Sequence, residues 1–286
     1  MRKLLLLFTL CITTTAVTAQ SDQAVIPEVG IVNDLENDSL IGSLGFGWLT
    51  EATPKILSPR TVSDEEFATL LPKIKSLQVP LYACNIFIPR ELKVVGPDVD
   101  EAAVLEYVEI VFQRARAAGL SLITWGSGGS REVPDGFSRL TATAQFIYMA
   151  KRVAEVAAEY DILLALENLN STECNFITTL PEALAVVKAV DHPNLRLCVD
   201  IYHMLMERES ADAIKGTGPY AIYCEIAERK DRAAPGVNGQ YFTPYFSALK
   251  DEGYTGKIMI EARWKDLALQ GETALETLRQ QLAEAY

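Results

Sequence analysis

The chain has 286 residues, of which 49% are hydrophobic and 22% are charged, and its formal net charge is −12 at pH 7. So strong a negative charge repels phosphate backbones and argues against a nucleic-acid-binding protein. The length exceeds that of a typical domain but lies within the range of one α/β barrel, so we expect a single domain.

The first residues predict a secretory signal peptide. Basic Arg2 and Lys3 precede the apolar run 4–10, and the segment ends on the small residues 16–19. The apolar run is too short to cross a bilayer, and no later segment is apolar enough, so we expect no membrane span. Cleavage after Ala19 removes 19 of the 286 residues and two positive charges, which leaves 267 residues with a formal charge of −14. After a short lead-in at 20–27, the mature protein is expected to be secreted or periplasmic.

Short β-rich runs alternate with helical patterns eight times along the rest of the chain, which indicates a parallel sheet with crossover helices. Eight such units predict a single (β/α)8 TIM barrel over residues 28–286. The expected strands are 28–33, 46–50, 80–86, 120–126, 162–168, 195–201, 221–227 and 257–262.

Two expected helices begin with a capping box, formed by Ser63 with Glu66 and by Thr179 with Glu182. In the helix that follows Ser138, apolar residues recur on one face, which predicts an outer helix with this face turned toward the barrel. Residues 34–61 are rich in Gly, Asn, Ser and Pro and are interpreted as the longest loop. Loops at the C-terminal face of a barrel commonly cover the substrate, so we expect that role for this segment.

Four cysteines remain once Cys11 leaves with the signal peptide. None lies in a C-x-x-C pair, and each lies in or beside an apolar strand-like run, which is typical of small core residues. Because an exported protein can form disulfides, a bridge between two of them is an alternative. The four are Cys84, Cys174, Cys198 and Cys224.

Carboxylates stand at the ends of four consecutive expected strands. They are Glu167, Asp200, Glu225 and Glu261, separated by 33, 25 and 36 residues, or about one βα unit each. Polar residues at the C-terminal ends of barrel strands point into the active site, so the four are expected to converge. Converging carboxylates repel one another and raise their pKa values, and a divalent cation removes that conflict. The pattern predicts a metal site; for each residue alone the alternative is a structural role, such as a helix cap by Asp200.

Several motifs make the chain resemble the xylose isomerase-like barrels, a family that includes ketose 3-epimerases, sugar phosphate isomerases and hydroxypyruvate isomerases. The resemblance runs from about Glu28 to the C-terminus. Its most specific motifs are GSGGSR at 126–131, LENLN at 166–170, VDIYHM at 199–204, RAAPG at 232–236, and GYTG at 253–256 leading to Glu261.

In that family the metal ligands are Glu, Asp, usually His, and Glu on the fifth to eighth strands, which the resemblance carries over to the four strand-end carboxylates. At the seventh-strand position this chain has Glu225 instead of the usual His. The hydroxypyruvate isomerases also lack the His there and use a Gln, which is likewise an oxygen ligand. An all-carboxylate set favours the hard cations Mn²⁺ and Mg²⁺, with Co²⁺ or Zn²⁺ as further options, and a weakened metal site is the alternative. The resemblance also implies that His203 and Arg232 bind the substrate.

Asn85, Lys93 and Trp125 are further candidates for the lining of the pocket, each with a structural role as the alternative. Residues 126–129 form either a tight strand-to-helix turn or a cradle for substrate oxygens. They are not a dinucleotide-binding fingerprint, because no G-x-G-x-x-G helix start follows. His192, in the sequence Asp-His-Pro-Asn, is interpreted as a turn residue.

These features predict a secreted, divalent-metal-dependent sugar isomerase or epimerase. Glu167 and Glu261 are assigned as the acid and base that move a proton beside the carbonyl of a keto sugar, through an enediolate. Because phosphorylated metabolites are cytoplasmic, export favours a free sugar or a glycoside as substrate. Two alternatives stay open: β-elimination from a 3-keto glycoside at the same site, and a carbohydrate-binding barrel without turnover.

Overall fold

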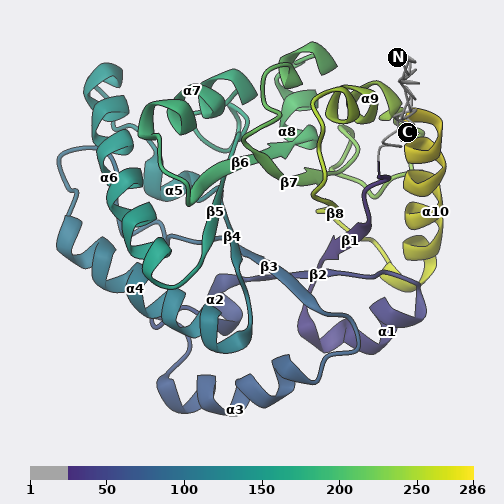
Figure 1. Cartoon of the computed structure of the whole chain (residues 1–286), viewed down its shortest axis with the longest axis horizontal. Helices are drawn as coiled ribbons and strands as arrows, with labels where there is room; N and C mark the ends of the chain where they lie inside the picture. The colour runs from purple at the N-terminus through teal and green to yellow at the C-terminus, as the bar shows by residue number, and fades with distance from the viewer. Residues whose placement is uncertain (1–24) are drawn as a thin grey trace, which may run out of the picture.

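The computed structural model describes residues 25–286, so the predicted signal peptide lies outside the described residues. Eight parallel strands follow one another in chain order and close into a barrel, with helices outside it (Figure 1). The closing contact joins the first strand to the last, where Val29 pairs with Ile258 and Ile31 with Ile260. The predicted single (β/α)8 TIM barrel is confirmed.

Seven of the eight strands lie within their predicted ranges, and the second is displaced toward the C-terminus. We expected it at 46–50, but the extended chain pairs with its neighbours only from Leu49 onward. The strands are β1 (Val29–Val32), β2 (Leu49–Ala52), β3 (Leu81–Asn85), β4 (Leu122–Trp125), β5 (Leu163–Glu167), β6 (Leu195–Asp200), β7 (Ala221–Ile226) and β8 (Lys257–Ile260).

The interpretation of residues 34–61 as one long loop was wrong. The segment contains two helices, a 3-10 turn and the whole of β2, because its Gly, Asn and Pro residues cap and separate short elements instead of forming a free loop. The helical elements are η1 (Leu35–Asn37), α1 (Asp38–Ser43), α2 (Thr53–Ile56), α3 (Asp64–Lys75), α4 (Glu101–Ala118), α5 (Gly128–Arg131), α6 (Arg139–Glu159), α7 (Leu180–Val190), α8 (Ile201–Met206), η2 (Ala211–Ile214), α9 (Thr243–Asp251) and α10 (Leu267–Ala285).

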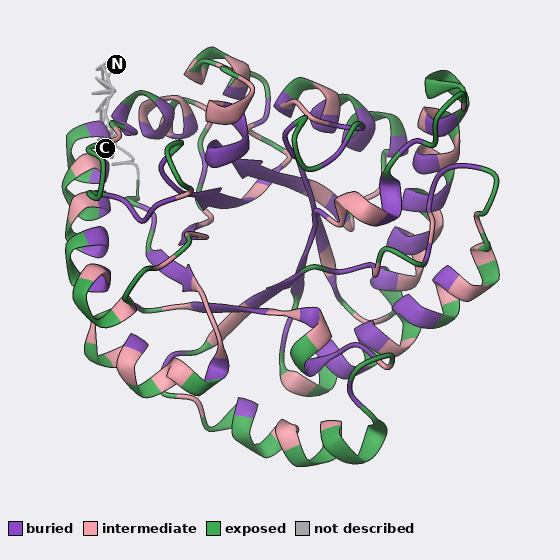
Figure 2. Cartoon of the chain, turned by 180° about the vertical axis from the view of Figure 1, so that it is seen from behind, coloured by how far each residue is buried: buried purple, intermediate pink, exposed green. Residues whose placement is uncertain are grey.

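Two apolar layers hold the barrel together. The larger lies between the strands and the helices, where the inward face of α6 contributes Phe146, Met149 and Val153 as predicted. Figure 2 shows this division, with buried strands at the centre and exposed residues on the outer faces of the helices. The smaller layer fills the barrel interior and consists of Ala83, Leu122, Ala165, Cys198, Tyr223 and Met259.

The predicted caps form with one difference. Ser63 and Glu66 make both hydrogen bonds of a capping box at the start of α3. At α7, Thr179 accepts a hydrogen bond from the Glu182 N–H, but the Glu182 carboxylate accepts from the N–H of Thr178 instead of Thr179. Both arrangements satisfy N–H groups that the first turn leaves free.

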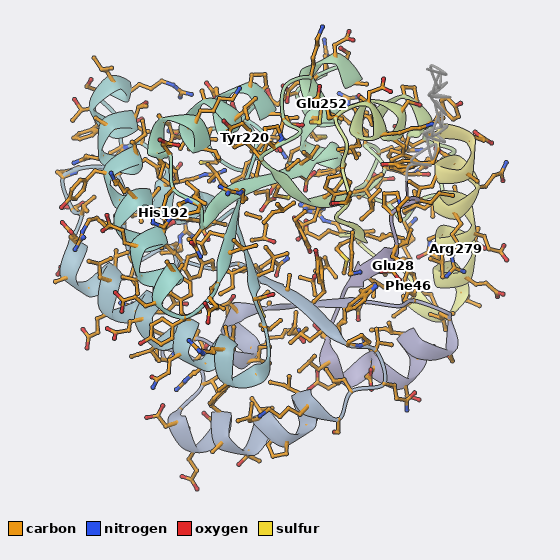
Figure 3. The ribbon with its side chains drawn as sticks, viewed as in Figure 1. Glu28, Phe46, His192, Tyr220, Glu252 and Arg279 are labelled. Atoms are coloured by element: carbon orange, nitrogen blue, oxygen red, sulfur yellow. The ribbon has the colours of Figure 1, made fainter. Side chains whose placement is uncertain are left out.

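The remaining structural predictions concern cysteines, His192 and membrane crossing. The four cysteines of the described chain are buried and unbridged, as predicted for core residues. His192, labelled in Figure 3, accepts a hydrogen bond from the Asn194 N–H at 3.1 Å, which confirms a turn residue. Among residues 25–286, no helix has both the length and the apolar composition that a bilayer crossing requires.

Candidate active site

The four strand-end carboxylates converge because side chains alternate along a strand. Glu167, Asp200 and Glu225 each stand two residues beyond a member of the apolar barrel interior, and Glu261 stands two residues beyond Met259. Residues two apart point to the same face of a strand, so all four side chains turn inward above the apolar layer. One oxygen from each carboxylate lies within 4.8 Å of the others.

Burial of this cluster disfavours the ionised form of its carboxyl groups. Asp200 and Glu225 are fully buried, and burial raises the pKa of both, while the other carboxylates raise the pKa of Glu225 further. Burial also raises the pKa of Glu261 to about 7, although the neighbouring Arg232 guanidinium opposes the rise. The cluster as a whole therefore favours a bound cation or protons over four uncompensated charges.

A divalent metal ion fits this cluster. One oxygen of Asp200, Oδ1, accepts a hydrogen bond from the His203 N–H at 2.8 Å and caps α8, whereas Oδ2 is buried without a hydrogen-bond partner. Asp200 thus caps a helix with one oxygen, which is the structural role considered as its alternative, and has a second, free oxygen at the cluster. Four hard oxygen donors at one point are the ligands that Mn²⁺ and Mg²⁺ prefer.

His203 lies against the cluster from the first turn of α8. Its Nε2 is 3.2 Å from Oε1 of Glu167 and 3.7 Å from Oδ2 of Asp200, and its Nδ1 is 2.7 Å from the Asn170 amide nitrogen. Burial lowers the pKa of His203, but Asp200 and Glu167 outweigh that effect and raise the value to about 9.

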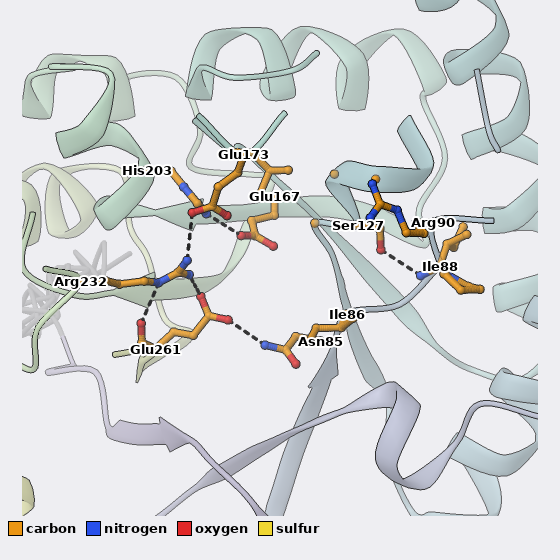
Figure 4. A pocket seen from close by; sticks show the side chains of 15 residues that line it. Asn85, Ile86, Ile88, Arg90, Ser127, Glu167, Glu173, His203, Arg232 and Glu261 are labelled. Atoms are coloured by element: carbon orange, nitrogen blue, oxygen red, sulfur yellow. Dashed lines mark hydrogen bonds and ion pairs between the residues drawn. The ribbon is translucent and has the colours of Figure 1, made fainter. Parts of the chain in front are cut away.

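Arg232 joins the loop after β7 to the end of β8. Its guanidinium donates to the carboxylate of Glu261 and, at 3.2 Å, to Oε1 of Glu173, and its Cζ lies 4.5 Å from the centre of the Tyr202 ring. On the other side of Glu261, the Asn85 amide donates to Oε1 at 2.9 Å. Figure 4 shows Glu261 held between Asn85 and Arg232, with Glu167 and His203 across the cavity.

The cavity above the cluster has a volume of about 480 Å³, within the size range of small-molecule sites. Glu167 and Glu261 line it, whereas Asp200 and Glu225 do not and lie beneath. Asn85, which was predicted to line the pocket, does so, and His203 and Arg232, which were predicted to bind the substrate, also belong to the lining. The cavity is completed by residues that follow β3, β4 and β5. They are Ile86, Ile88, Pro89 and Arg90 after β3, Gly126 and Ser127 after β4 with Gly128 and Gly129 at the start of α5, and Leu169 and Glu173 after β5.

Two predicted lining residues lie elsewhere. Trp125 is fully buried and packs its ring 5.3 Å from Phe146 and 5.7 Å from Phe87, because as the last residue of β4 it points to the helix side. Lys93 donates a hydrogen bond to the carbonyl of Gly129 at 2.8 Å and does not line the cavity. The segment 34–61, expected as a cover, contributes no residue to the lining.

The sequence analysis missed two charged residues of the cavity, Glu173 and Arg90. Both stand in irregular segments, where no strand-end rule assigns a direction to a side chain. The one available signal for Glu173 is its place six residues after Glu167. Residues 126–129 turn out to be both a strand-to-helix turn and a wall of the cavity.

Comparison with known proteins agrees with this geometry. Residues 40–284 match the family model described as xylose isomerase-like TIM barrel. The chain is 30% identical over 180 residues to a Mus musculus protein named as a hydroxypyruvate isomerase, covering 60% of this chain and 64% of that protein. It is 28% identical over 228 residues to the D-psicose 3-epimerase of Agrobacterium fabrum, covering 77% and 76%.

Among solved structures, the D-psicose 3-epimerase of Clostridium cellulolyticum H10 with D-tagatose matches with a TM-score of 0.77 at 23% identity, covering 89% of this chain and 99% of that one. At this level of identity the match establishes the fold. The family model spans most of the described residues, and each motif that carries the resemblance contains or leads to a residue of the cavity lining. The chain belongs to the xylose isomerase-like TIM barrel family.

Proposed function

We propose that the chain is a divalent-metal-dependent epimerase or isomerase of a keto sugar. The observation that carries this proposal is the division within the carboxylate cluster, where Glu167 and Glu261 face the cavity and Asp200 and Glu225 lie beneath it. A carboxylate that exchanges a proton with a substrate carbon must reach the substrate, whereas a ligand that only holds a metal need not. A carbohydrate-binding barrel without turnover needs no such pair.

When bound by the cluster, a divalent cation would polarise the substrate carbonyl as a Lewis acid. Arg232 and His203 line the cavity beside the cluster and are placed to donate hydrogen bonds to sugar oxygens. One of Glu167 and Glu261 takes the proton from the carbon next to the carbonyl. Return of a proton by the other carboxylate to the opposite face gives an epimer, and return to the former carbonyl carbon gives an isomer.

The relatives support a keto compound as substrate. The names of the two curated relatives describe an epimerase of a ketose and an isomerase of a keto acid. Both activities require removal of a proton next to a carbonyl, which is the chemistry that two cavity-facing carboxylates supply.

We further propose that the protein is exported and acts on a sugar without a phosphate group. The support is the basic, apolar and small-residue succession at 1–19. Cell fractionation followed by N-terminal sequencing tests export, with a mature end near Gln20 as the expected result. Protein that retains Met1 in the cytoplasm would contradict it.

The decisive test of the activity is solvent deuterium incorporation followed by NMR. Purified protein with Mn²⁺ is incubated in D₂O with neutral ketoses, ketose acids and 3-keto glycosides. We expect deuterium at the carbon beside the carbonyl together with the epimer or isomer. Release of the aglycone from a 3-keto glycoside, without either product, would replace this proposal with the lyase alternative. Absence of exchange with every substrate would refute it.

A further inference from the structure

The cavity has a second charged end, formed by Arg90. Figure 4 shows Arg90 on the far side of the cavity from Arg232 and Glu261, beside Ser127 and Ile88. The other cationic groups of the lining are engaged: Arg232 contacts Glu261 and Glu173, and His203 contacts Glu167 and Asp200. Arg90 is exposed, and within residues 25–286 no carboxylate lies within ion-pair distance of its guanidinium.

The turn after β4 makes room for Glu167, and the start of α5 makes room for Arg90. A Cβ at Gly126 would lie 2.1 Å from Oε2 of Glu167, and a Cβ at Gly129 would lie 2.8 Å from the Cβ of Arg90 and 3.6 Å from its Nε. Two glycines three residues apart therefore each have a charged side chain packed against them. The turn places a carboxylate toward one end of the cavity and a guanidinium toward the other.

The wall beside Arg90 is apolar and includes an unusual backbone conformation. Ile86 has φ of 50° and is 54% exposed, although a β-branched residue in the left-handed region is an outlier. Ile86 follows Asn85, which holds Glu261, and it lines the same cavity with Ile88 and Pro89. Because Arg90 itself is exposed, solvent screens its charge, and recognition of a ligand there depends on paired hydrogen bonds from the guanidinium.

From this arrangement we infer that the substrate carries a carboxylate at the end remote from its carbonyl, and that Arg90 binds it. The substrate class is thus a keto sugar acid. A guanidinium recognises a carboxylate through two parallel hydrogen bonds. Because the chain as a whole has a formal charge of −12, its overall field does not attract an anion, and a local cation must supply the recognition. This inference rests on the proposed function and goes on to name the substrate.

The test compares matched pairs of substrates in the deuterium-exchange assay, with D-fructuronate against D-fructose and D-tagaturonate against D-tagatose. For the wild type we expect kcat/KM to be roughly 10- to 100-fold higher for the acids, the usual effect of a charge-assisted contact. Arg90→Gln should remove this preference mainly through a higher KM for the acids, because Arg90 lies away from the reacting carbons. Arg90→Lys should restore part of it.

Lys93→Gln is the matched control, since it removes a nearby positive charge that does not line the cavity. It should leave the preference unchanged. Equal kcat/KM for acid and neutral ketose, an equal loss on both substrates in Arg90→Gln, or a preference for D-fructose 6-phosphate over D-fructuronate would overturn the inference while the proposed function stands. No exchange with any substrate of the panel would instead reject the proposed function.

Discussion

The α-carbon of Gly126 faces the carboxylate of Glu167 so closely that a methyl group at position 126 would lie 2.1 Å from Oε2 of Glu167. Gly126 has no positive φ, so its lack of a side chain serves this contact and not a left-handed backbone. The first turn of the β4–α5 connection is therefore part of what orients a candidate metal ligand.

Gly126→Ala should displace Glu167 and weaken both metal binding and turnover by about 10- to 100-fold, the range typical of residues that orient a ligand. Calorimetric titration with Mn²⁺ and the exchange assay measure the two effects. Gly47→Ala is the control, because a Cβ at position 47 meets no atom within 4 Å. Unchanged Mn²⁺ affinity in Gly126→Ala would show that Glu167 adjusts without loss.

Glu167→Gln and Glu261→Gln should each reduce turnover by at least about two orders of magnitude, the usual scale for a general acid or base. Glutamine keeps one oxygen as a ligand, so exchange is measured at saturating Mn²⁺ to separate proton transfer from metal loss. Glu272→Gln on the exposed face of α10 provides the control. A variant that retains near-full activity would exclude its residue from the mechanism.

Glu225 should shift the metal preference toward hard cations. Glu225→His replaces a charged hard oxygen with a neutral, softer nitrogen, so affinity for Zn²⁺ and Co²⁺ should rise relative to Mg²⁺. Glu225→Ala leaves three carboxylates and should weaken binding of every metal. Calorimetric titration of the three proteins with Mn²⁺, Mg²⁺ and Zn²⁺ decides the matter, and identical affinities throughout would mean that Glu225 is no ligand.

Removal of metal should lower thermal stability. A ligand present at about 100 times its Kd stabilises the folded state by about 2.7 kcal/mol, which for a chain of this size corresponds to roughly 5 to 10 °C in Tm. Thermal unfolding with Mn²⁺ and after chelation measures the shift. The shift should disappear in Asp200→Asn/Glu225→Gln, and its persistence there would locate the stabilising ion elsewhere.

Glu228 should affect turnover through Arg232. Its buried carboxylate binds the loop after β7, and Glu228→Gln places an amide against backbone donors and should loosen the segment that carries Arg232. We expect a loss of roughly tenfold in kcat/KM, and a less than multiplicative loss when Arg232→Lys is added. The Glu228 carboxylate accepts hydrogen bonds from four backbone N–H groups, those of Gly236 at 2.9 Å, Asn238 at 2.6 Å, Gly239 at 3.1 Å and Gln240 at 3.3 Å.

Glu252→Gln is the control for this experiment. Glu252, which is labelled in Figure 3, also binds a loop, because it accepts a hydrogen bond from the backbone N–H of Gly218 at 2.9 Å, but it does not line the cavity. It should leave kcat/KM unchanged. A fully multiplicative loss in Glu228→Gln/Arg232→Lys would mean that Glu228 stabilises the loop without positioning Arg232.

The cluster could be predicted from the sequence because strand geometry fixes it. Once Glu167 and Asp200 are placed at the ends of parallel strands, the barrel brings them to one rim, and alternation decides which face they occupy. The same alternation explains the error at Trp125. It stands at a strand end as Glu167 does, but its register is one residue different, so it points to the helices while Gly126 faces the cavity.

What could not be predicted lies in the connections. Lys93 and Arg90 are three residues apart in the same segment, and nothing in their residue types indicates that one binds a carbonyl and the other lines the cavity. Their directions depend on tertiary packing against Gly129. The displacement of β2 has a similar cause, because its start is set by pairing with β1 and β3 and not by local composition.

All four candidate ligands stand at the C-terminal ends of β5 to β8, whereas Asn85 ends β3, and Arg90 and Gly126 come from the connections that follow β3 and β4. Under the proposed function, the C-terminal half would carry the proton chemistry, and the N-terminal half would make much of the contact with the rest of the substrate. We therefore expect that exchange of the loops after β3 and β4 between members of the family would change which sugar is accepted. Because Gly126 and Asn85 touch Glu167 and Glu261, such grafts should keep these two positions.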